Sequence, residues 1–302
     1  MDYLKEHLNI GWLRPESALW DAIASEKAAH IPIESPSLDF GCGNGLYSFV
    51  AAGGAFDIDY DWFVHARSRG FRAAKDIYDV AAVADPGRHV RRRPRYRFDH
   101  AFDHKKNLLS QAAKLDFYGT LKSGDGNERW PYADGEMKTI YCNMLYWLND
   151  PRARFREISR VLRRGGRAIL CLQHPRFKTM CESYQWRPRR SEFLRILNRG
   201  RAETHDWTVD TAELKSLSKS AGLKLAHHDT YLSAATLKFW DTGLRPLSPA
   251  LIEMARRLAP ADRRAVKKEW LASALPLLRE MLVEERRAVN PGGYHLAILE
   301  KV

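Results

Sequence analysis

Short apolar runs alternate with amphipathic segments along most of this chain. The first such unit is the apolar run 37–40, followed by a cluster of glycines and by the helix-compatible segment 46–52. Short apolar or alternating runs bounded by turn residues indicate further strands. They lie at 97–103, 119–124, 139–143, 167–172, 223–231 and 294–299. Strands that alternate with helices favour a mostly parallel sheet with helices on both faces.

Helical periodicity fills most of the spaces between these strands. The segment 14–30 begins close to Pro15, a residue that suits the first turn of a helix. The segment 53–96 breaks the pattern, apart from one predicted helix at 61–74, and we interpret it as an insertion. Other helices are predicted through 108–113, over 152–162 with an end at Gly165-Gly166, over 211–221 and across 248–289.

This pattern divides the chain into an N-terminal cap helix, within 1–36, and an α/β domain over 37–302. The domain carries two insertions, at 53–96 and 232–290. Insertions at the carboxyl edge of a sheet commonly carry specificity. We therefore expect the N-terminal helix and both insertions to form a helical cap over that edge.

Composition excludes several classes of protein. Hydrophobic residues make up 45% and charged residues 28% of the 302 positions, which excludes disordered and fibrous chains. No apolar run approaches the roughly 18 residues of a membrane helix, and charges near the N-terminus argue against a signal peptide. We expect a cytoplasmic protein. The four cysteines form no C-x-x-C pair, so neither a metal site nor a disulfide framework is predicted.

The formal net charge of +12 favours an anionic partner, because the arginines are clustered rather than scattered. The planar guanidinium suits phosphate and carboxylate groups. We expect the first and last of these clusters to lie near the carboxyl edge of the sheet; the alternative is that they only solvate helix faces. The clusters lie at 88–97, 152–167 and 187–201.

The chemistry is expected just after the strands, because ligands of parallel α/β sheets bind outside the carboxyl ends of the strands. Gly41, Gly43 and Gly45 allow a sharp turn and a close approach of the backbone to a ligand. Asp103 ends the next strand of the pattern, where a carboxylate can accept hydrogen bonds from ribose hydroxyls.

Two further strand ends carry polar residues. Asp125 follows the strand 119–124, where it can accept a hydrogen bond from an adenine amino group. Asn143 ends the strand 139–143, where its amide can meet the amino-acid end of a ligand. Each residue alone could be a turn former or helix cap. Their order on consecutive strands instead predicts one ligand site.

At these positions the sequence resembles a known family. Asp39-Phe-Gly-Cys-Gly-Asn-Gly45 resembles the glycine-rich motif of class I S-adenosylmethionine-dependent methyltransferases. Residues 124–135, 140–151 and 155–166 resemble later blocks of the quinone-biosynthesis subgroup. The resemblance implies a Rossmann-like fold with a mostly parallel seven-stranded sheet, and S-adenosylmethionine as cofactor. It covers 37–52 and 97–172, and more loosely 207–231 and 294–300.

The resemblance also implies which residues bind the cofactor. The family's ribose-binding acid usually stands about twenty residues or fewer after the glycines. Asp57 and Asp59 occupy that distance here, but they leave too short a first helix. We assign Asp103 because 101–109 has the expected strand end and helix start. The expected cofactor-binding residues are Asp39, Gly41, Cys42, Gly43, Asn44, Gly45, Asp103, His104, Asp125, Gly126 and Asn143.

The implied reaction is in-line transfer of a methyl group from a sulfonium to a nucleophile. His174 is the candidate catalytic residue, a general base for a hydroxyl acceptor; the alternative is that it bonds the loop backbone before Pro175. Tyr146 and Trp147 stand where many relatives have a histidine. We expect them, together with Arg176, to bind the acceptor.

The expected acceptor is a small or lipid-linked anion, such as a sugar or glycan intermediate, methylated on oxygen. The alternatives are a nucleic-acid methyltransferase and a non-catalytic nucleic-acid-binding protein, since the same arginines would also bind nucleic acid or an anionic membrane surface. The glycine spacing argues against a nicotinamide-dependent oxidoreductase, as does the position of Tyr118 and Lys122 at a loop-to-strand junction. The sequence carries no signal for the oligomeric state.

Overall fold

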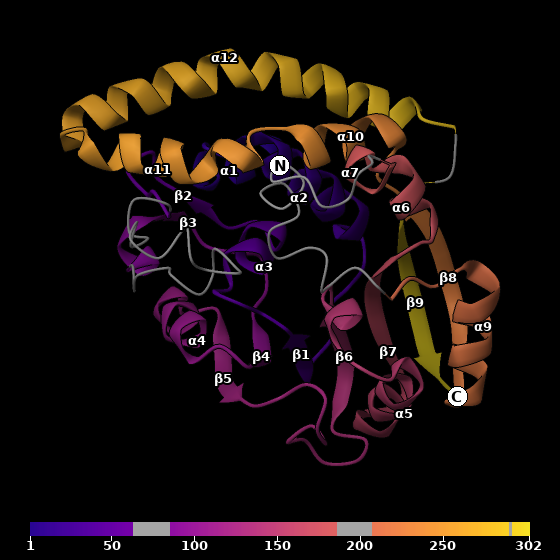
Figure 1. Cartoon of the computed structure of the whole chain (residues 1–302). Helices are drawn as coiled ribbons and strands as arrows, with labels where there is room; N and C mark the ends of the chain where they lie inside the picture. Colours follow the sequence, from indigo (N-terminus) through magenta and orange to yellow (C-terminus); the bar gives the residue numbers. More distant parts are fainter. Residues whose placement is uncertain (63–84, 186–206, 290–291) are drawn as a thin grey trace.

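The computed structural model describes residues 1–62, 85–185, 207–289 and 292–302, and a seven-stranded sheet runs through its centre (Figure 1). The strand order is β5-β4-β1-β6-β7-β9-β8, and β9 is antiparallel to both of its neighbours while the other pairs are parallel. This arrangement confirms the predicted fold class. The strands are β1 (Ser37–Phe40), β4 (Phe98–Asp103), β5 (Tyr118–Ser123), β6 (Met137–Cys142), β7 (Leu162–Gln173), β8 (Leu223–Tyr231) and β9 (Tyr294–Lys301).

Helices cover both faces of the sheet. The amphipathic α5 (Pro151–Val161) and α9 (Thr211–Ser220) pack on one face through buried residues such as Phe155 and Leu214. The other face is covered by α1 (Tyr3–Ile10), α2 (Pro15–Ala28), α3 (Leu46–Ala51) and α4 (Lys106–Ala112). A separate two-stranded ribbon pairs β2 (Ala55–Phe56) with β3 (Val90–Arg92).

The strand register aligns the carboxyl ends that the sequence marked. Phe40, the last residue of β1, is paired with Phe102 of β4 and with Cys142 of β6. The residues that follow, the first glycine of the turn, Asp103 and Asn143, therefore lie beside one another at the same edge.

Helices from both ends of the chain gather over this edge (Figure 1). Trp20 of α2 contacts Tyr294, the first residue of β9, at 4.7 Å between ring centroids, and Trp240 at the same distance. The buried Lys267 donates a 2.6 Å hydrogen bond to the carbonyl of Tyr60 in the first insertion. The C-terminal helices are α10 (Ala234–Thr242), α11 (Ser248–Arg257) and α12 (Pro260–Arg287).

The predicted cap segments thus pack against one another, while their role toward an acceptor stays a prediction. Two short helices, α6 (Arg176–Met180) and α7 (Glu182–Gln185), follow β7. None of the helices in the described ranges is long and apolar enough to cross a membrane.

Three differences from the sequence prediction are larger than a shift of a residue or two at an element's end. The N-terminal part has two helices, because Asp2 caps α1 through the amide of Lys5 (3.0 Å) ahead of an apolar face. The strand β7 already begins at Leu162, so the glycine pair at 165–166 lies within it and does not end the helix. The region 248–289 forms two helices, since Pro260 begins a new one. The predicted helix at 61–74 lies almost entirely outside the described residues.

Candidate functional site

The candidate site begins at the glycine turn between β1 and α3. Gly41, Gly43 and Gly45 have φ angles of +79°, +56° and +77°. A Cβ atom at Gly41 would lie 2.0 Å from Cγ of Met144, and one at Gly45 would lie 2.8 Å from Cε2 of Tyr118. The turn therefore requires glycine for its backbone conformation and for the space around it.

Asp103, the last residue of β4, holds this turn in place. Its Oδ2 accepts a hydrogen bond from the amide of Gly43 (2.9 Å), and its Oδ1 accepts one from the amide of Lys105 (2.8 Å). The side chain of Asp103 is nearly buried, whereas the adjacent His104 is 60% exposed. An ionised carboxylate offers about four lone-pair positions, so Asp103 retains acceptor capacity for ligand hydroxyls.

Asp39 lies buried behind the turn, on the face of the sheet that α3 covers. Its Oδ2 accepts a 2.7 Å hydrogen bond from the hydroxyl of Tyr118. Burial raises the pKa of Asp39 to about 6; the nearby Asp103 also raises it, while hydrogen bonds from Ser48 and Tyr118 lower it. The hydrogen bond therefore joins the end of β1 to Tyr118 of β5, directly behind the glycine turn.

The two other residues of the turn are also nearly buried. Oδ1 of Asn44 accepts a 3.2 Å hydrogen bond from the amide of Leu46 at the start of α3. The amide of Cys42 donates to the carbonyl of Phe102 (3.1 Å), and burial raises the pKa of its thiol. Both residues thus shape the turn, and the thiol stays protonated at neutral pH.

The loop after β5 carries Asp125 and Gly126. The exposed carboxylate of Asp125 accepts hydrogen bonds from the backbone and side-chain nitrogens of Asn127 at 2.8 and 3.0 Å. A Cβ atom at Gly126 would approach the side chain of Leu148 to 2.9 Å and the ring of Phe40 to 3.1 Å. The loop is therefore closely packed over the end of β1.

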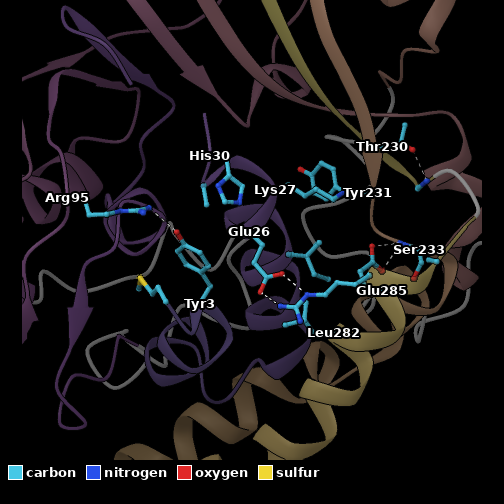
Figure 2. A pocket seen from close by; sticks show the side chains of 16 residues that line it. Tyr3, Glu26, Lys27, His30, Arg95, Thr230, Tyr231, Ser233, Leu282 and Glu285 are labelled. Carbon is cyan, nitrogen blue, oxygen red and sulfur yellow. Dashed lines mark hydrogen bonds and ion pairs between the residues drawn. The ribbon is translucent and has the colours of Figure 1, made fainter. Parts of the chain in front are cut away.

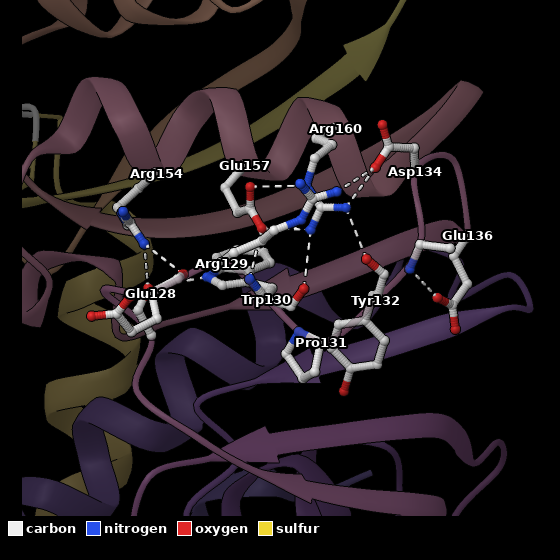
Figure 3. Close-up of polar contacts among 12 residues, drawn as sticks. Glu128, Arg129, Trp130, Pro131, Tyr132, Asp134, Glu136, Arg154, Glu157 and Arg160 are labelled. Atoms are coloured by element: carbon white, nitrogen blue, oxygen red, sulfur yellow. Dashed lines mark hydrogen bonds and ion pairs between the residues drawn. The ribbon is translucent and has the colours of Figure 1, made fainter.

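Arg160 of α5 fastens the rest of this loop (Figure 3). Its guanidinium donates to the backbone carbonyls of Trp130 (3.1 Å) and Tyr132 (2.8 Å), and to the carboxylates of Glu157 and Asp134. Glu157 also accepts a 2.7 Å hydrogen bond from the amide of Trp130. The hydrogen bond to Glu157 raises the pKa of Arg160, so the cation persists. The network fixes the loop that presents Asp125.

The residues at these strand ends fit the groups of S-adenosylmethionine. Its ribose offers hydroxyls, its adenine an amino group, and its amino-acid part an amine and a carboxylate. Asp103 stands nearly buried beside the glycine turn, Asp125 is exposed beyond the neighbouring strand, and Asn143 is half-buried at the end of β6. This set of acceptors and donors matches the ligand chemistry, and the role of each residue stays a prediction.

The predicted acceptor-binding residues lie beside an aromatic cluster. Tyr146 lies 6.1 Å from Tyr294 of β9 and 6.1 Å from Trp147, measured between ring centroids. Trp147 is 44% exposed. The cluster extends through Tyr294 to Trp20 and Trp240, so it joins α2, α10 and the segment after β6.

His174 and Arg176 follow β7, and both contact backbone. Nδ1 of His174 accepts a 3.0 Å hydrogen bond from the amide of Arg176, and the guanidinium of Arg176 donates to the carbonyl of Gly292 at 3.2 and 3.3 Å. Burial and the nearby Arg176 lower the pKa of His174 to about 4. This is the backbone contact that the sequence offered as the alternative; a role as general base stays a prediction.

Part of the arginine cluster 88–97 lies at the opposite edge of the sheet from the one we predicted. Arg93 and Arg97 pair with Asp116 at 3.5 and 3.0 Å, and Asp116 precedes β5. The physical reason is that the first insertion leads directly into the amino end of β4. For Arg93 and Arg97 the expected position at the carboxyl edge is therefore wrong.

Two neighbouring arginines of the same cluster are paired with the N-terminal helix. Arg91 and Arg92 lie 2.8 and 3.7 Å from Oε1 of Glu6 in α1. These ion pairs therefore hold the first insertion against α1. The cluster 187–201 lies outside the described residues.

A cavity of about 590 Å³ lies between α2, α12 and the end of β8 (Figure 2). In its wall Arg286 donates to both carboxylate oxygens of Glu26, and Glu285 accepts from the amide of Ser233 at the start of α10. Arg95 donates to the hydroxyl of Tyr3 (3.1 Å). The predicted cofactor-binding residues, all of them described, do not line this cavity.

Three residues that the sequence did not mark as functional support the site or lie at its edge. Tyr118 supports Asp39, and Arg160 fastens the loop after β5. Gln173, the last residue of β7, is 1% exposed, and within the described part of the chain neither atom of its amide has a hydrogen-bond partner. These contacts join segments that are distant in sequence, so local patterns carry no signal for them; only the position of Gln173 at a strand end marks it.

Comparison with known proteins agrees with this geometry. Residues 97–170 match a family model described as a methyltransferase domain. A malonyl-[acyl-carrier protein] O-methyltransferase of Hahella chejuensis is 30% identical over 134 residues, which cover 44% of this chain and 34% of that protein. The chain thus spans about a third of the length of this curated relative. The predicted methyltransferase resemblance and its cofactor, S-adenosylmethionine, are confirmed at the level of the domain.

Solved structures give a weaker likeness. A methyltransferase bound to the Trm112 activator of Haloferax volcanii is 15% identical, with a TM-score of 0.48 and coverage of 100% of this chain and 98% of that one. A methyltransferase of Thermotoga maritima described as a possible histamine N-methyltransferase is 10% identical, with a TM-score of 0.48 and coverage of 95% and 91%. The fold class rests on the strand order of this chain itself.

Proposed function

We propose that the protein is an S-adenosylmethionine-dependent methyltransferase that acts on a small-molecule acceptor. One observation carries the proposal: the register of β1, β4 and β6 aligns the glycine turn with Asp103 and Asn143, and the last two belong to the segment that matches a methyltransferase domain. A tight turn next to a hydroxyl-binding acid suits a nucleoside ligand.

Each strand end would hold one part of the cofactor. Asp103 would accept the ribose hydroxyls, Asp125 the adenine amino group, and Asn143 with the glycine turn would hold the amino-acid part. When bound, S-adenosylmethionine supplies an electrophilic methyl group on a sulfonium. The chain contributes by positioning the acceptor in line with that group and by excluding water from the site.

His174 can serve as a base only if its present contact changes. Nδ1 accepts a hydrogen bond from the backbone amide of Arg176, so the neutral ring carries its proton on Nε2. Neither ring nitrogen then has a free lone pair that could take a proton from the hydroxyl of an acceptor. We therefore expect His174→Gln to lower kcat less than tenfold, whereas loss of a general base costs about 10²- to 10⁴-fold. Steady-state kinetics of the variant decide this, and a loss of a hundredfold or more would assign the base to His174.

The predicted anionic acceptor, a sugar or glycan intermediate, has less support than the reaction class. Arginines 91, 92, 93 and 97 are paired with carboxylates, so they offer an anion little free charge. The same pairing weakens the alternative of a nucleic-acid substrate. We therefore keep the proposal at a small-molecule acceptor methylated on oxygen.

Calorimetry tests the reaction class. We expect S-adenosylhomocysteine to bind the full chain with a Kd in the micromolar range, and NAD to show no binding at millimolar concentration. Binding of NAD, or of neither compound, would reject the proposed function.

A further inference from the structure

The surface beside the proposed methyl-transfer site is aromatic. Trp20, Trp240 and Tyr146 are each partly exposed, and they surround the fully buried Phe177 and Tyr294. The centroid distances are 4.7 Å for Trp20–Trp240 and for Trp20–Tyr294, 5.7 Å for Phe177–Trp240 and 5.6 Å for Phe177–Tyr294. The ring side chains of this cluster carry no charge, and their faces suit a flat apolar molecule.

One polar group in this cluster makes no well-formed hydrogen bond. Gln173 is paired in register with Tyr294, and its amide lies near the Tyr294 hydroxyl, whose pKa it lowers against the larger effect of burial. Neither amide atom makes a hydrogen bond to any described residue, although the side chain is 1% exposed. An unpaired buried amide costs about 1–3 kcal/mol, so its presence indicates a missing partner.

The position of Gln173 relates it to the proposed reaction. It ends β7, and β7 is the direct neighbour of β6, whose end carries Asn143. The cluster therefore lies one strand away from the proposed cofactor site. The aromatic side chains of the cluster come largely from α2, α10 and the segment after β6. Most of the cluster therefore lies outside residues 97–170, which match the methyltransferase domain.

We propose that the acceptor is a planar, uncharged, largely apolar molecule that lies against this aromatic cluster and hydrogen-bonds to the amide of Gln173. This inference rests on the proposed methyltransferase function. It assigns Gln173 to acceptor specificity and places the acceptor in a different class from phosphorylated sugars.

The test uses 2-naphthol as a flat, neutral probe that carries one hydroxyl. Its binding to the full chain saturated with S-adenosylhomocysteine is measured by calorimetry, with glucose 6-phosphate as the anionic comparison. We expect 2-naphthol to bind in the submillimolar to millimolar range and glucose 6-phosphate not to bind. Gln173→Leu should raise the Kd of 2-naphthol about fivefold to tenfold, because one neutral hydrogen bond is lost. The Kd of S-adenosylhomocysteine should stay unchanged.

A matched control separates this role from a structural one. Gln111 is also 1% exposed but lies on α4, so Gln111→Leu should leave 2-naphthol binding unchanged. Replacing an unpaired amide with an apolar group should also leave the Gln173→Leu variant at least as stable as the parent. No binding of 2-naphthol, equal binding to both variants, or binding of glucose 6-phosphate in its place would overturn the proposal. Failure of S-adenosylhomocysteine to bind would instead reject the proposed function.

Discussion

Asp39 makes the stability of the glycine turn depend on pH. Its carboxyl group is buried, and its pKa is raised from 3.8 to about 6. Between these two values the folded state keeps a proton that the unfolded state has lost. Stability therefore falls as pH rises from about 4 to 6, and the whole cost of the buried charge is present above pH 6.

Asp39→Asn tests this effect. The amide oxygen of asparagine can still accept the hydrogen bond from Tyr118, but the group no longer ionises. We expect the free energy of unfolding to rise by about 3 kcal/mol at pH 8 and by only about 1 kcal/mol at pH 4.5. Urea unfolding at both pH values measures it, and an equal effect at the two would contradict the argument.

Tyr118→Phe should act in the opposite direction. It removes the 2.7 Å hydrogen bond to Asp39 and leaves the ring that packs under Gly45. A hydrogen bond to a charged group contributes about 1.5–3 kcal/mol, so we expect that loss at pH 8 and a smaller one at pH 4.5, where Asp39 is protonated. The same urea titrations give the answer, and a larger loss at the lower pH would refute it.

At the scale of elements, the loop after β5 depends on α5. Arg160 bonds two backbone carbonyls of the loop and two carboxylates, and its side chain is 15% exposed. Removing it would leave Glu157, with a 14% exposed side chain, without its cation. The loop after β5 would then lose the two hydrogen bonds that Arg160 donates to the carbonyls of Trp130 and Tyr132.

We expect Arg160→Met to lower the free energy of unfolding by about 2–4 kcal/mol, because a nearly buried partner loses its counter-charge. Arg156→Met, at an exposed position of the same helix, should change it by less than about 0.5 kcal/mol. Urea unfolding compares the two variants. Similar values for both would show that the network does not stabilise the loop.

The sequence predicted elements best where local signals were strong. The strands 223–231 and 37–40 have the predicted bounds, because turn residues flank both segments. The start of β7 was misplaced, since a strand that crosses a glycine pair is stabilised by its neighbours β6 and β9 and not by its own residues. The partner of Asp39 could not be predicted, because Tyr118 reaches it across the sheet.

At the scale of the molecule, the cap and the sheet share one hydrophobic core. Trp12 of the N-terminal segment, Ile252 of α11 and Leu282 of α12 belong to the same buried cluster as Tyr141 and Ile169 of the sheet. The cap therefore has no apolar interior of its own, whereas the opposite face of the sheet forms a second buried cluster with α5 and α9. Cap and sheet are therefore expected to unfold together.

We expect a single cooperative transition in urea, with coincident curves from far-ultraviolet circular dichroism and tryptophan fluorescence. Most of the tryptophans lie in or beside the cap segments, so fluorescence follows the cap, while circular dichroism follows the whole chain. Two separated transitions would show that the cap is an independent unit.

The central claim is that the aligned ends of β1, β4 and β6 hold the methyl donor. A crystal structure of the full chain with S-adenosylhomocysteine tests it most directly. The account predicts the ribose hydroxyls within hydrogen-bond distance of the Asp103 carboxylate and the amino-acid part against the glycine turn. A ligand bound elsewhere, such as in the cavity between α2 and α12, with Asp103 bonded only to Gly43 and Lys105, would contradict it.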